Sequence, residues 1–247
     1  MPRSRASGCA LWYAPAQAIP WHQPSSRRSG RGCDDSPVGA HSRPPRRETL
    51  PPGGPHATTR ALERADRARA VVLVEGFSDQ LALETLAARH GRDLAAESVA
   101  IVPIGGAQAI DRYLSRFAHA TLAGLCDAGE EAVFRRGLAR ARVGPVLTRD
   151  AMAELGFHVC VEDLEDELIR ALGPGGVEAV LREHGELGSF RTFQKQPAWR
   201  GKPVDAQLRR FLASADRRKL RYARLLVEAL PLRDVPRPLD GVLAHVS

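Results

Sequence analysis

Acidic side chains recur at the ends of apolar segments in this sequence. Three short apolar stretches, 71–74, 121–126 and 157–161, are each followed directly by a carboxylic acid. Carboxylates held a few Å apart repel one another and raise each other's pKa unless a cation lies among them. The acids concerned are Glu75 with Asp79, Asp127 with Glu130 and Glu131, and Glu162 with Asp163, Glu165 and Asp166.

Divalent cations are natural counter-ions for such a group. Mg²⁺ and Mn²⁺ prefer oxygen ligands and bridge to phosphates, and two ions about 3.5–4 Å apart can stabilise both reacting oxygens of a phosphodiester. The short motifs themselves contain no Lys or Arg that could pair the acids. A single acid, Asp163 or Glu131 above all, is explained as well by the favourable field at a helix N-terminus. The threefold recurrence favours a shared metal site.

The elements that would position these acids alternate between strand and helix. The run 71–74 is apolar on both faces, which is typical of a strand inside a parallel sheet, and Ser78 is expected to cap the following helix. The pattern predicts an α/β fold, with right-handed βαβ units, a parallel sheet of about four strands flanked by helices, and a helical C-terminal extension. Such sheets bind ligands at the carboxyl ends of their strands. The predicted strands are 71–74, 98–102, 121–126 and 157–161, and the predicted helices are 60–69, 79–90, a helix from Gly106 to about 117, 130–141, 162–172, 175–184, 203–214 and 217–230.

The motifs resemble those of the Toprim domain. The stretch Val-Leu-Val-Glu75-Gly76-Phe-Ser78-Asp79, a second strand followed by Gly105-Gly106, a third strand ending in Asp127 and a later acidic helix match its pattern. The E-G-x-S-D form of the first motif is similar to that of the OLD (overcoming lysogenization defect) nucleases. The resemblance covers about residues 70–230. It implies a Toprim-like Rossmannoid sheet that binds Mg²⁺ or Mn²⁺ and acts on DNA.

The resemblance also implies roles for individual acids. Glu75 resembles the family's invariant glutamate, a metal ligand or general base, and Asp79 resembles its nearby metal-binding aspartate. Asp127 resembles the first acid of the D-x-D motif. Glu165 resembles the later metal-binding glutamate, with Glu162 as the alternative.

Two features depart from the family pattern. The run Asp127-Ala128-Gly129-Glu130 lacks the second acid of D-x-D, so either Glu130 takes over from the next turn or one metal site is weakened. OLD nucleases also carry an N-terminal ATPase, whereas this sequence has no G-x-x-x-x-G-K-[ST] motif. Any ATP-dependent step would therefore need a separate ATPase subunit as a partner.

The net charge of +7 is distributed unevenly along the chain. Residues 61–188 carry a net charge of −7, whereas residues 189–233 carry +9. The basic segment either faces the phosphates of DNA or forms a solvated helical surface. The resemblance implies a phosphate contact by Lys219, with Lys202 and Lys195 as competitors. The candidate nucleic-acid contacts are Lys195, Arg200, Lys202, Arg218 and Lys219.

Composition divides the chain into three regions. Residues 1–60 hold ten of the 18 prolines and show no apolar periodicity, so they are predicted to be disordered. Residues 61–187 would form the Toprim-like domain, and residues 188–247 the basic helical extension. No stretch of 18 apolar residues occurs, so no membrane span is expected. The four cysteines form no C-x-x-C pair and give no disulfide framework, which favours a cytoplasmic protein.

Some residues permit two interpretations. Gly105-Gly106 forms either a tight turn, which is favoured, or a phosphate cradle at a helix start. His158 is expected to be structural, and Cys126 to be a small buried residue. Trp199 lies among basic residues, where it either stacks on bases or anchors the basic helices to the sheet.

Three functions are compatible with these features. The leading hypothesis is a metal-dependent DNA endonuclease or nickase, a phosphodiester hydrolase. The second is a catalytically weak nucleic-acid-binding or regulatory Toprim module, because the D-x-D pair is incomplete. The third is a primase-type nucleotidyl transferase, which shares the metal site.

Overall fold

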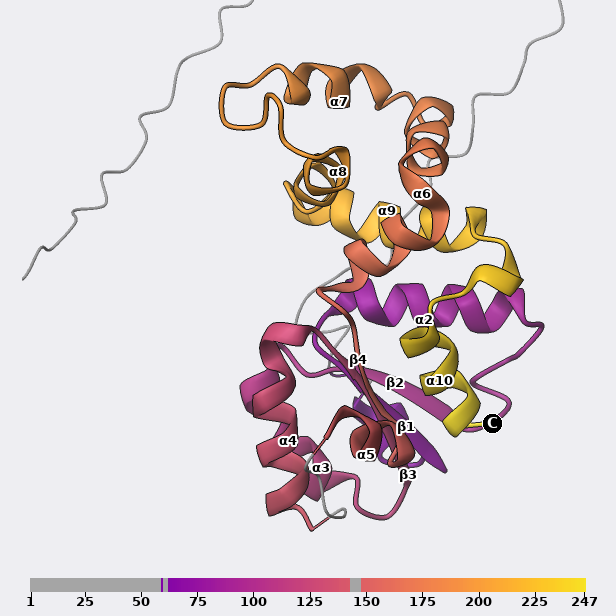
Figure 1. The fold of residues 1–247 in the computed structure, drawn as a ribbon. Coiled ribbons are helices and arrows are strands. Elements are labelled where there is room, and N and C mark those ends of the chain that lie inside the picture. Colours follow the sequence, from indigo (N-terminus) through magenta and orange to yellow (C-terminus); the bar gives the residue numbers. More distant parts are fainter. Residues whose placement is uncertain (1–58, 60–61, 143–147) are drawn as a thin grey trace, which may run out of the picture. The chain divides into compact units, whose positions relative to one another are not determined.

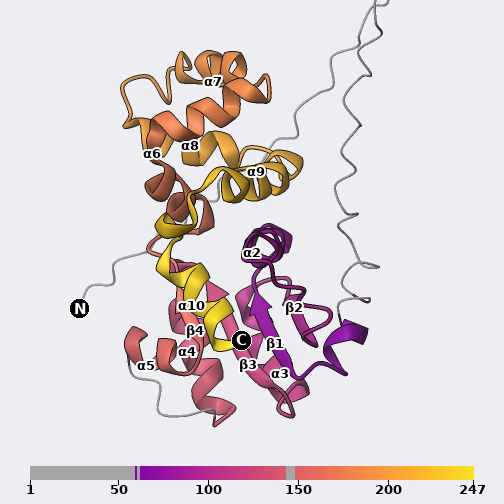
Figure 2. The same cartoon turned by 90° about the vertical axis from the view of Figure 1, so that its right-hand side faces the viewer.

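The computed structural model describes Thr59, residues 62–142 and residues 148–247. Four parallel strands form one sheet in the order β2-β1-β3-β4 (Figures 1 and 2). β1 pairs with β2 in the register Ala70↔Val99 and with β3 in the register Ala70↔Thr121, and β4 joins β3 at Gly124↔Phe157. The strands begin and end within two residues of the predicted positions. They are β1 (Ala70–Val74), β2 (Val99–Pro103), β3 (Thr121–Cys126) and β4 (Phe157–Val159).

β1 is buried over its full length because helices cover both faces of the sheet. Val72 and Val74 enter one core, whereas Val71 and Leu73 enter the other. The continuous apolar run therefore reflects a strand with two buried faces. Cys126, at the end of β3, is buried in the second core as a small apolar residue, as expected.

One face of the sheet is covered by α2 and by helices from the C-terminal half. The core there joins Leu83 of α2 to Leu168 of α6, Leu226 of α9 and Val242 of α10. α2 and α9 lie side by side (Figure 1). The C-terminal extension and the sheet thus share one core. The helices are α2 (Phe77–Arg89), α6 (Leu164–Glu183), α7 (Leu187–Gln194), α8 (Val204–Leu212), α9 (Asp216–Ala229) and α10 (Arg237–His245).

The opposite face is covered by shorter helices. Leu114 of α3, Phe134 of α4 and Met152 of α5 pack there against Phe157 of β4. None of the helices in the described ranges combines the length and apolar character that a membrane span requires. The helices on this face are α3 (Ile110–Arg116), α4 (Glu131–Arg140) and α5 (Arg149–Glu154). The 3-10 turns of the described residues are η1 (Ala107–Ala109), η2 (Ala128–Glu130) and η3 (Leu232–Asp234).

Some helices differ from the predictions. No helix is predicted from the sequence at α5, α7 or α10. α6 spans two predicted helices, but Gly173 interrupts it with a non-helical φ of 69° just before Pro174. The predicted helix 60–69 is helical at 62–65. The predicted disorder of residues 1–60 lies outside the described residues, except for Thr59 and its helical assignment.

The start of α2 corrects the expected role of Ser78. The N-cap is Gly76, whose backbone is extended and whose N–H donates to Asp79 Oδ2 at 2.9 Å. Ser78 lies inside the first turn and is buried. Asp79 takes the capping role because a carboxylate at the third helical position can reach back to the N-cap amide, where the helix field also favours negative charge.

α10 is held against β4 by close contacts between histidines and glycines. Gly241 lies against the imidazole of His158, and Gly156 lies against that of His245, so closely that a Cβ on either glycine would overlap the ring. At the C-terminal end of α10, Arg92 donates to backbone carbonyls, and a cation is favourable at that end of a helix.

We expect His158 to make the fold sensitive to acid. Burial, and then the charge of His245, lower the pKa of His158 below its ordinary value of 6.5, so the unfolded chain takes up the proton more readily than the folded one. The stability that the neutral ring contributes is present above about pH 6.5 and is lost as the pH falls toward the folded pKa. His158→Phe removes this dependence. The difference in Tm between wild type and variant should therefore change between about pH 7.5 and about pH 5.5, and a constant difference would contradict the prediction.

Gly124→Ala should destabilise the sheet. A Cβ at Gly124 would lie 2.6 Å from Cδ1 of Phe157 and 3.0 Å from the carbonyl oxygen of Leu73, and Phe157 is too deeply buried to move aside. Overpacking of this kind costs about 1–3 kcal/mol of unfolding free energy, measurable by urea denaturation. Gly188→Ala is the matched control, because nothing lies within 4 Å of its added Cβ. Equal stability of the two variants would show that the contact is not restrictive.

Candidate functional site

The carboxyl ends of β1 and β3 meet where the chain changes direction across the sheet. From β1 the chain passes to β2 on one side and then returns to β3 on the other, and open α/β sheets bind ligands beyond such a switch point. Glu75 follows β1 and Asp127 follows β3. Oε1 of Glu75 accepts the N–H of Asp127 at 2.8 Å. Two acids that the sequence predicts to converge are thus joined directly.

Asp79 lies in the first turn of α2 and is 8 % exposed. Its pKa is raised to about 7, first by burial and then by the charges of Glu165 and Glu75. The N–H of Gly76 and the charge of Lys219 act in the opposite direction. Asp79 is therefore close enough to Glu165 and Glu75 for their charges to raise its pKa.

Asp127 and Glu75 disfavour each other's ionisation. The pKa of Asp127 is raised to about 8 by burial and then by the charges of Glu75 and Asp79. Burial also raises the pKa of Glu75, to which the charge of Glu130 adds, although the N–H of Asp127 and the charge of Lys219 lower it. The carboxylates at these strand ends thus form one interacting group.

Glu165 and Lys219 complete this group from two helices of the C-terminal half. Glu165, in the first turn of α6, is buried, and its Oε2 lies 3.5 Å from Nζ of Lys219 on α9. Its Oε1 is buried without a hydrogen-bond partner. Burial raises the pKa of Glu165, and Lys219 opposes this shift. We call Glu75, Asp79, Asp127 and Glu165 the carboxylate cluster.

The charge of Lys219 reaches across the carboxylate cluster. Burial lowers the pKa of Lys219, but the charges of Glu165, Asp79 and Asp127 outweigh this effect and leave the pKa above its ordinary value. Sequence reasoning finds no cation within the acidic motifs because this one comes from a helix far along the chain.

Glu130 and Glu162 lie at the margin of the carboxylate cluster. Glu130 ends the η2 turn after Asp127, and its carboxylate forms no ion pair within the described part of the chain. Glu162 is exposed and lies 3.5 Å from Arg209 of α8. Of the two acids considered for the later motif, Glu165 is therefore the one directed toward the cluster.

Two other acids occupy helix ends, as the dipole interpretation expects. Asp163 is the N-cap of α6, where its side chain accepts the N–H of Asp166 at 2.8 Å, and Arg209 donates to it at 2.6 Å. Glu131 begins α4 and pairs with Arg149 of α5 at 2.6 Å. Both acids serve local structure.

The Gly105-Gly106 pair forms a turn that supports Glu75. Both glycine N–H groups point to the carbonyl of Glu75, at 3.2 and 3.3 Å, and both residues have a positive φ, of 74° and 111°. Because these amides already have an acceptor, the turn interpretation is confirmed over the phosphate cradle.

The candidate nucleic-acid contacts divide into exposed and paired residues. Lys195, Arg200 and Lys202 are exposed in and around the loop between α7 and α8. Arg218 instead donates to Glu186 at 2.7 Å. That bond engages Arg218 inside the helical extension, whereas the three loop residues face solvent.

Trp199 packs in an aromatic cluster of the same loop. Its ring stacks on Phe193 at 5.3 Å, and Phe193 lies 5.7 Å from Phe211 of α8. The buried Gln207 also donates to the carbonyl of Trp199 at 2.8 Å. Trp199 is thus an anchor, as one interpretation proposes, but it ties the loop to α8 and not to the sheet.

The carboxylate cluster fits a divalent ion in its chemistry but not as a finished cage. Its donors are hard oxygens, and one of them, Oε1 of Glu165, is buried without a partner. Among the described residues, however, no three His, Cys, Asp or Glu side chains converge closely enough to hold a metal ion. Binding an ion would therefore require the side chains to close around it.

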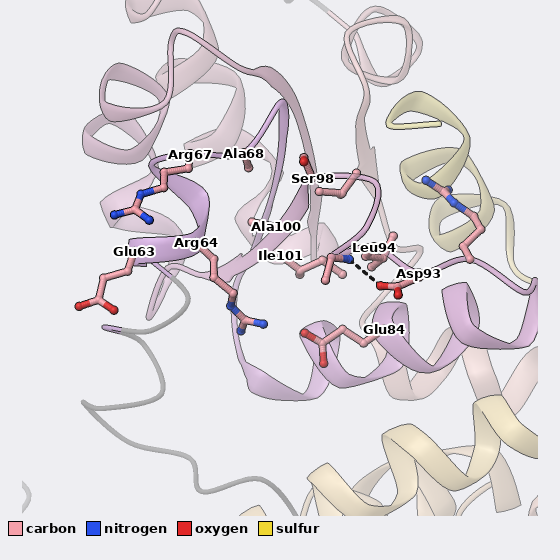
Figure 3. A pocket seen from close by; sticks show the side chains of 13 residues that line it. Glu63, Arg64, Arg67, Ala68, Glu84, Asp93, Leu94, Ser98, Ala100 and Ile101 are labelled. Carbon is pink, nitrogen blue, oxygen red and sulfur yellow. Dashed lines mark hydrogen bonds between the residues drawn. The ribbon is translucent and has the colours of Figure 1, made fainter.

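A groove of about 880 Å³ lies elsewhere, along the free edge of β2 (Figure 3). Ser98 and Ile101 line it, together with Arg64 and Glu84, whose charged ends point toward each other (Figure 3). No member of the carboxylate cluster lines this groove. This groove is therefore a different place from the carboxylate cluster.

The sheet and the acids at its switch point define a Toprim-like α/β domain. Residues 68–123 match the family described as "Overcoming lysogenization defect protein-like, TOPRIM domain". This stretch is thus similar to an OLD-like Toprim domain, a class that is related to nucleic acids and whose members generally bind divalent metals. The ranges that the structure describes contain no ATPase domain.

Two solved structures show the same fold. The C-terminal region of the Xanthomonas campestris pv. campestris OLD protein matches with a TM-score of 0.56 and 20% identity, covering 72% of this chain and 92% of that one. The C-terminal region of the Burkholderia pseudomallei OLD protein matches with a TM-score of 0.54 and 17% identity, covering 72% and 97%. The expected fold is thus confirmed. A comparison with curated proteins finds no match.

Asp127→Asn should stabilise the metal-free protein. Burial and the neighbouring acids raise the pKa of Asp127 to about 8, so near neutral pH the folded protein must protonate an acid that is ionised in the unfolded chain. The neutral amide removes this cost, and we expect a gain of roughly 1 kcal/mol in unfolding free energy near neutral pH. Chemical denaturation in the presence of a chelator measures it. Asp205→Asn, at an exposed acid of α8, is the control and should bring no gain. Loss of stability in Asp127→Asn would show that its charge is already compensated.

Proposed function

We propose that this protein is a metal-dependent DNA endonuclease or nickase, a hydrolase of phosphodiester bonds. The observation that carries the proposal is the carboxylate cluster at the switch point, where four acids share the charge of a single lysine, Lys219. Such a surplus of negative charge favours a hard dication. The OLD-like Toprim domain supplies the nucleic-acid context.

The roles of the residues follow from their positions. Glu75, Asp79, Asp127 and Glu165 would hold one or two Mg²⁺ or Mn²⁺ ions, with Glu130 available from the next turn. Bound ions would supply Lewis-acid stabilisation of the reacting phosphodiester oxygens. Oε1 of Glu75 accepts the N–H of Asp127, which orients the carboxylate and leaves Oε2 for a ligand bond or for a proton.

The helical extension would provide the contacts to DNA. Lys195, Arg200 and Lys202 are exposed in one loop, where they can neutralise backbone phosphates. Lys219 lies next to the cluster and would contact the phosphate at the scissile bond. Arg218 would first have to leave Glu186. A separate ATPase subunit remains the proposed partner for any ATP-dependent step.

A second candidate is a catalytically weak nucleic-acid-binding or regulatory module. Two observations favour it: the second acid of D-x-D is absent from the Asp127 motif, and the described acids do not form a ready-made group of three ligands. In this case the same basic loop would bind DNA without cleavage.

Glu75→Gln should abolish nicking of supercoiled plasmid. We expect wild-type protein to convert supercoiled DNA to the open circular form with Mg²⁺ or Mn²⁺, and the variant to be slower by at least about 100-fold, because it loses a ligand or a base in the reacting site. Gel electrophoresis of a time course measures the rates, and a chelator should stop the wild-type reaction.

The matched control is Glu154→Gln, which neutralises an exposed acid of α5 and should keep the wild-type rate. DNA binding by fluorescence anisotropy distinguishes the two candidates. Binding without metal-dependent nicking would support the module and exclude the nuclease. Synthesis of oligonucleotides from added nucleotides would point to the transferase instead.

A further inference from the structure

We infer that Lys219 is an internal counter-ion of the carboxylate cluster, and that its ammonium group and a divalent cation compete for Glu165. The inference rests on the proposed metal site, and it concerns how that site is kept folded and how it exchanges its cation. It does not require that the protein cleaves DNA.

The contact between Lys219 and Glu165 is incomplete from the side of the carboxylate. Nζ lies 3.5 Å from Oε2, which is an ion pair without a short hydrogen bond, while Oε1 is buried and has no partner. A buried carboxylate that lacks a hydrogen-bond partner pays a desolvation cost. Lys219 therefore satisfies Glu165 only in part, and a divalent cation that bound the carboxylate through both oxygens would replace this long ion pair.

Other cations nearby are engaged by other acids. Arg209 bonds to Asp163 at 2.6 Å, and Arg218 and Arg221, on either side of Lys219 in α9, both bond to Glu186. Lys219, in contrast to these arginines, is directed toward the carboxylate cluster. Lys219 therefore supplies positive charge to the carboxylate cluster, whereas Arg218 and Arg221 stabilise the helical extension through Glu186.

The balance of charge explains why a divalent cation should be able to replace Lys219 as the partner of Glu165. One ammonium group balances one of four carboxylates, whereas a dication balances two and offers several coordination positions. The Lys219 side chain is 38% exposed and Glu165 is 6% exposed, so the ammonium group can turn toward solvent or a phosphate while the carboxylate stays in place. A lysine suits this exchange because its charge sits at the end of a flexible stem.

The first test measures Mn²⁺ affinity by calorimetry. Lys219→Met should bind Mn²⁺ about tenfold more tightly than wild type, because the competing cation is gone, and the metal-free variant should have a lower Tm that Mn²⁺ restores. Arg217→Met removes one positive charge from an exposed position of the same helix, α9, and should change neither value. Unchanged or weaker Mn²⁺ binding by Lys219→Met would overturn the inference.

The second test follows the lysine directly in the wild-type protein, and Lys219→Met serves only to assign its signal. The chain has three lysines, Lys195, Lys202 and Lys219, so selective ¹³C labelling of lysine gives three resolvable Cε signals, one of which is absent in Lys219→Met. In metal-free wild type the Lys219 signal should be distinct and broad. Saturation with Mg²⁺, or Glu165→Gln without metal, should move it toward the other two. A Lys219 signal that Mg²⁺ leaves unchanged would overturn the competition.

The two tests separate this inference from the proposed function. If wild type binds neither Mn²⁺ nor Mg²⁺, the metal site and the competition both fall, and the proposed nuclease falls with them. If wild type binds metal and nicks DNA but Lys219 stays paired, the nuclease stands and this inference alone is overturned. If Lys219 is released but no nicking occurs, the inference stands for a metal-binding module.

Discussion

Repulsion among partly buried carboxylates is the constraint on which the rest of this structure depends. Burial and mutual charge raise the pKa of Asp79 to about 7 and that of Asp127 to about 8. A fold gains nothing in stability by gathering such groups, since each opposes the ionisation of the next. That they nevertheless meet at one edge is the observation on which the proposed metal site rests.

Two devices allow the sheet to tolerate this arrangement. Backbone amides are directed at the acids: the N–H of Asp127 binds Glu75, and the N–H of Gly76 binds Asp79. The second device is a cation from outside the sheet, supplied by α9. Both are fixed by the two cores on either side of the strands, so the packing of apolar side chains indirectly sets the electrostatics of the site.

The sheet is well predicted because each strand is a short apolar run that can be recognised from its own residues. β1 is a continuous apolar run, and Glu75, Asp79 and Asp127 follow strand ends, so topology alone brings them together. The pairing of Lys219 with Glu165 has no local signature, since the two residues meet through tertiary packing. Gly241 similarly gives no sign in the sequence that it makes room for His158.

The interruption of α6 at Gly173 separates the part of this helix next to the acids from the part that leads away from them. The chain leaves the acidic edge at Glu165, passes through the kink, builds α7 and α8, and returns at Lys219. The segment between these two residues therefore begins and ends at the carboxylate cluster, where Glu165 and Lys219 contact each other. Its core residues, among them Leu168 and Leu208, pack with the sheet, whereas the loop between α7 and α8 is largely exposed. That loop can therefore change its surface without disturbing the contact between Glu165 and Lys219.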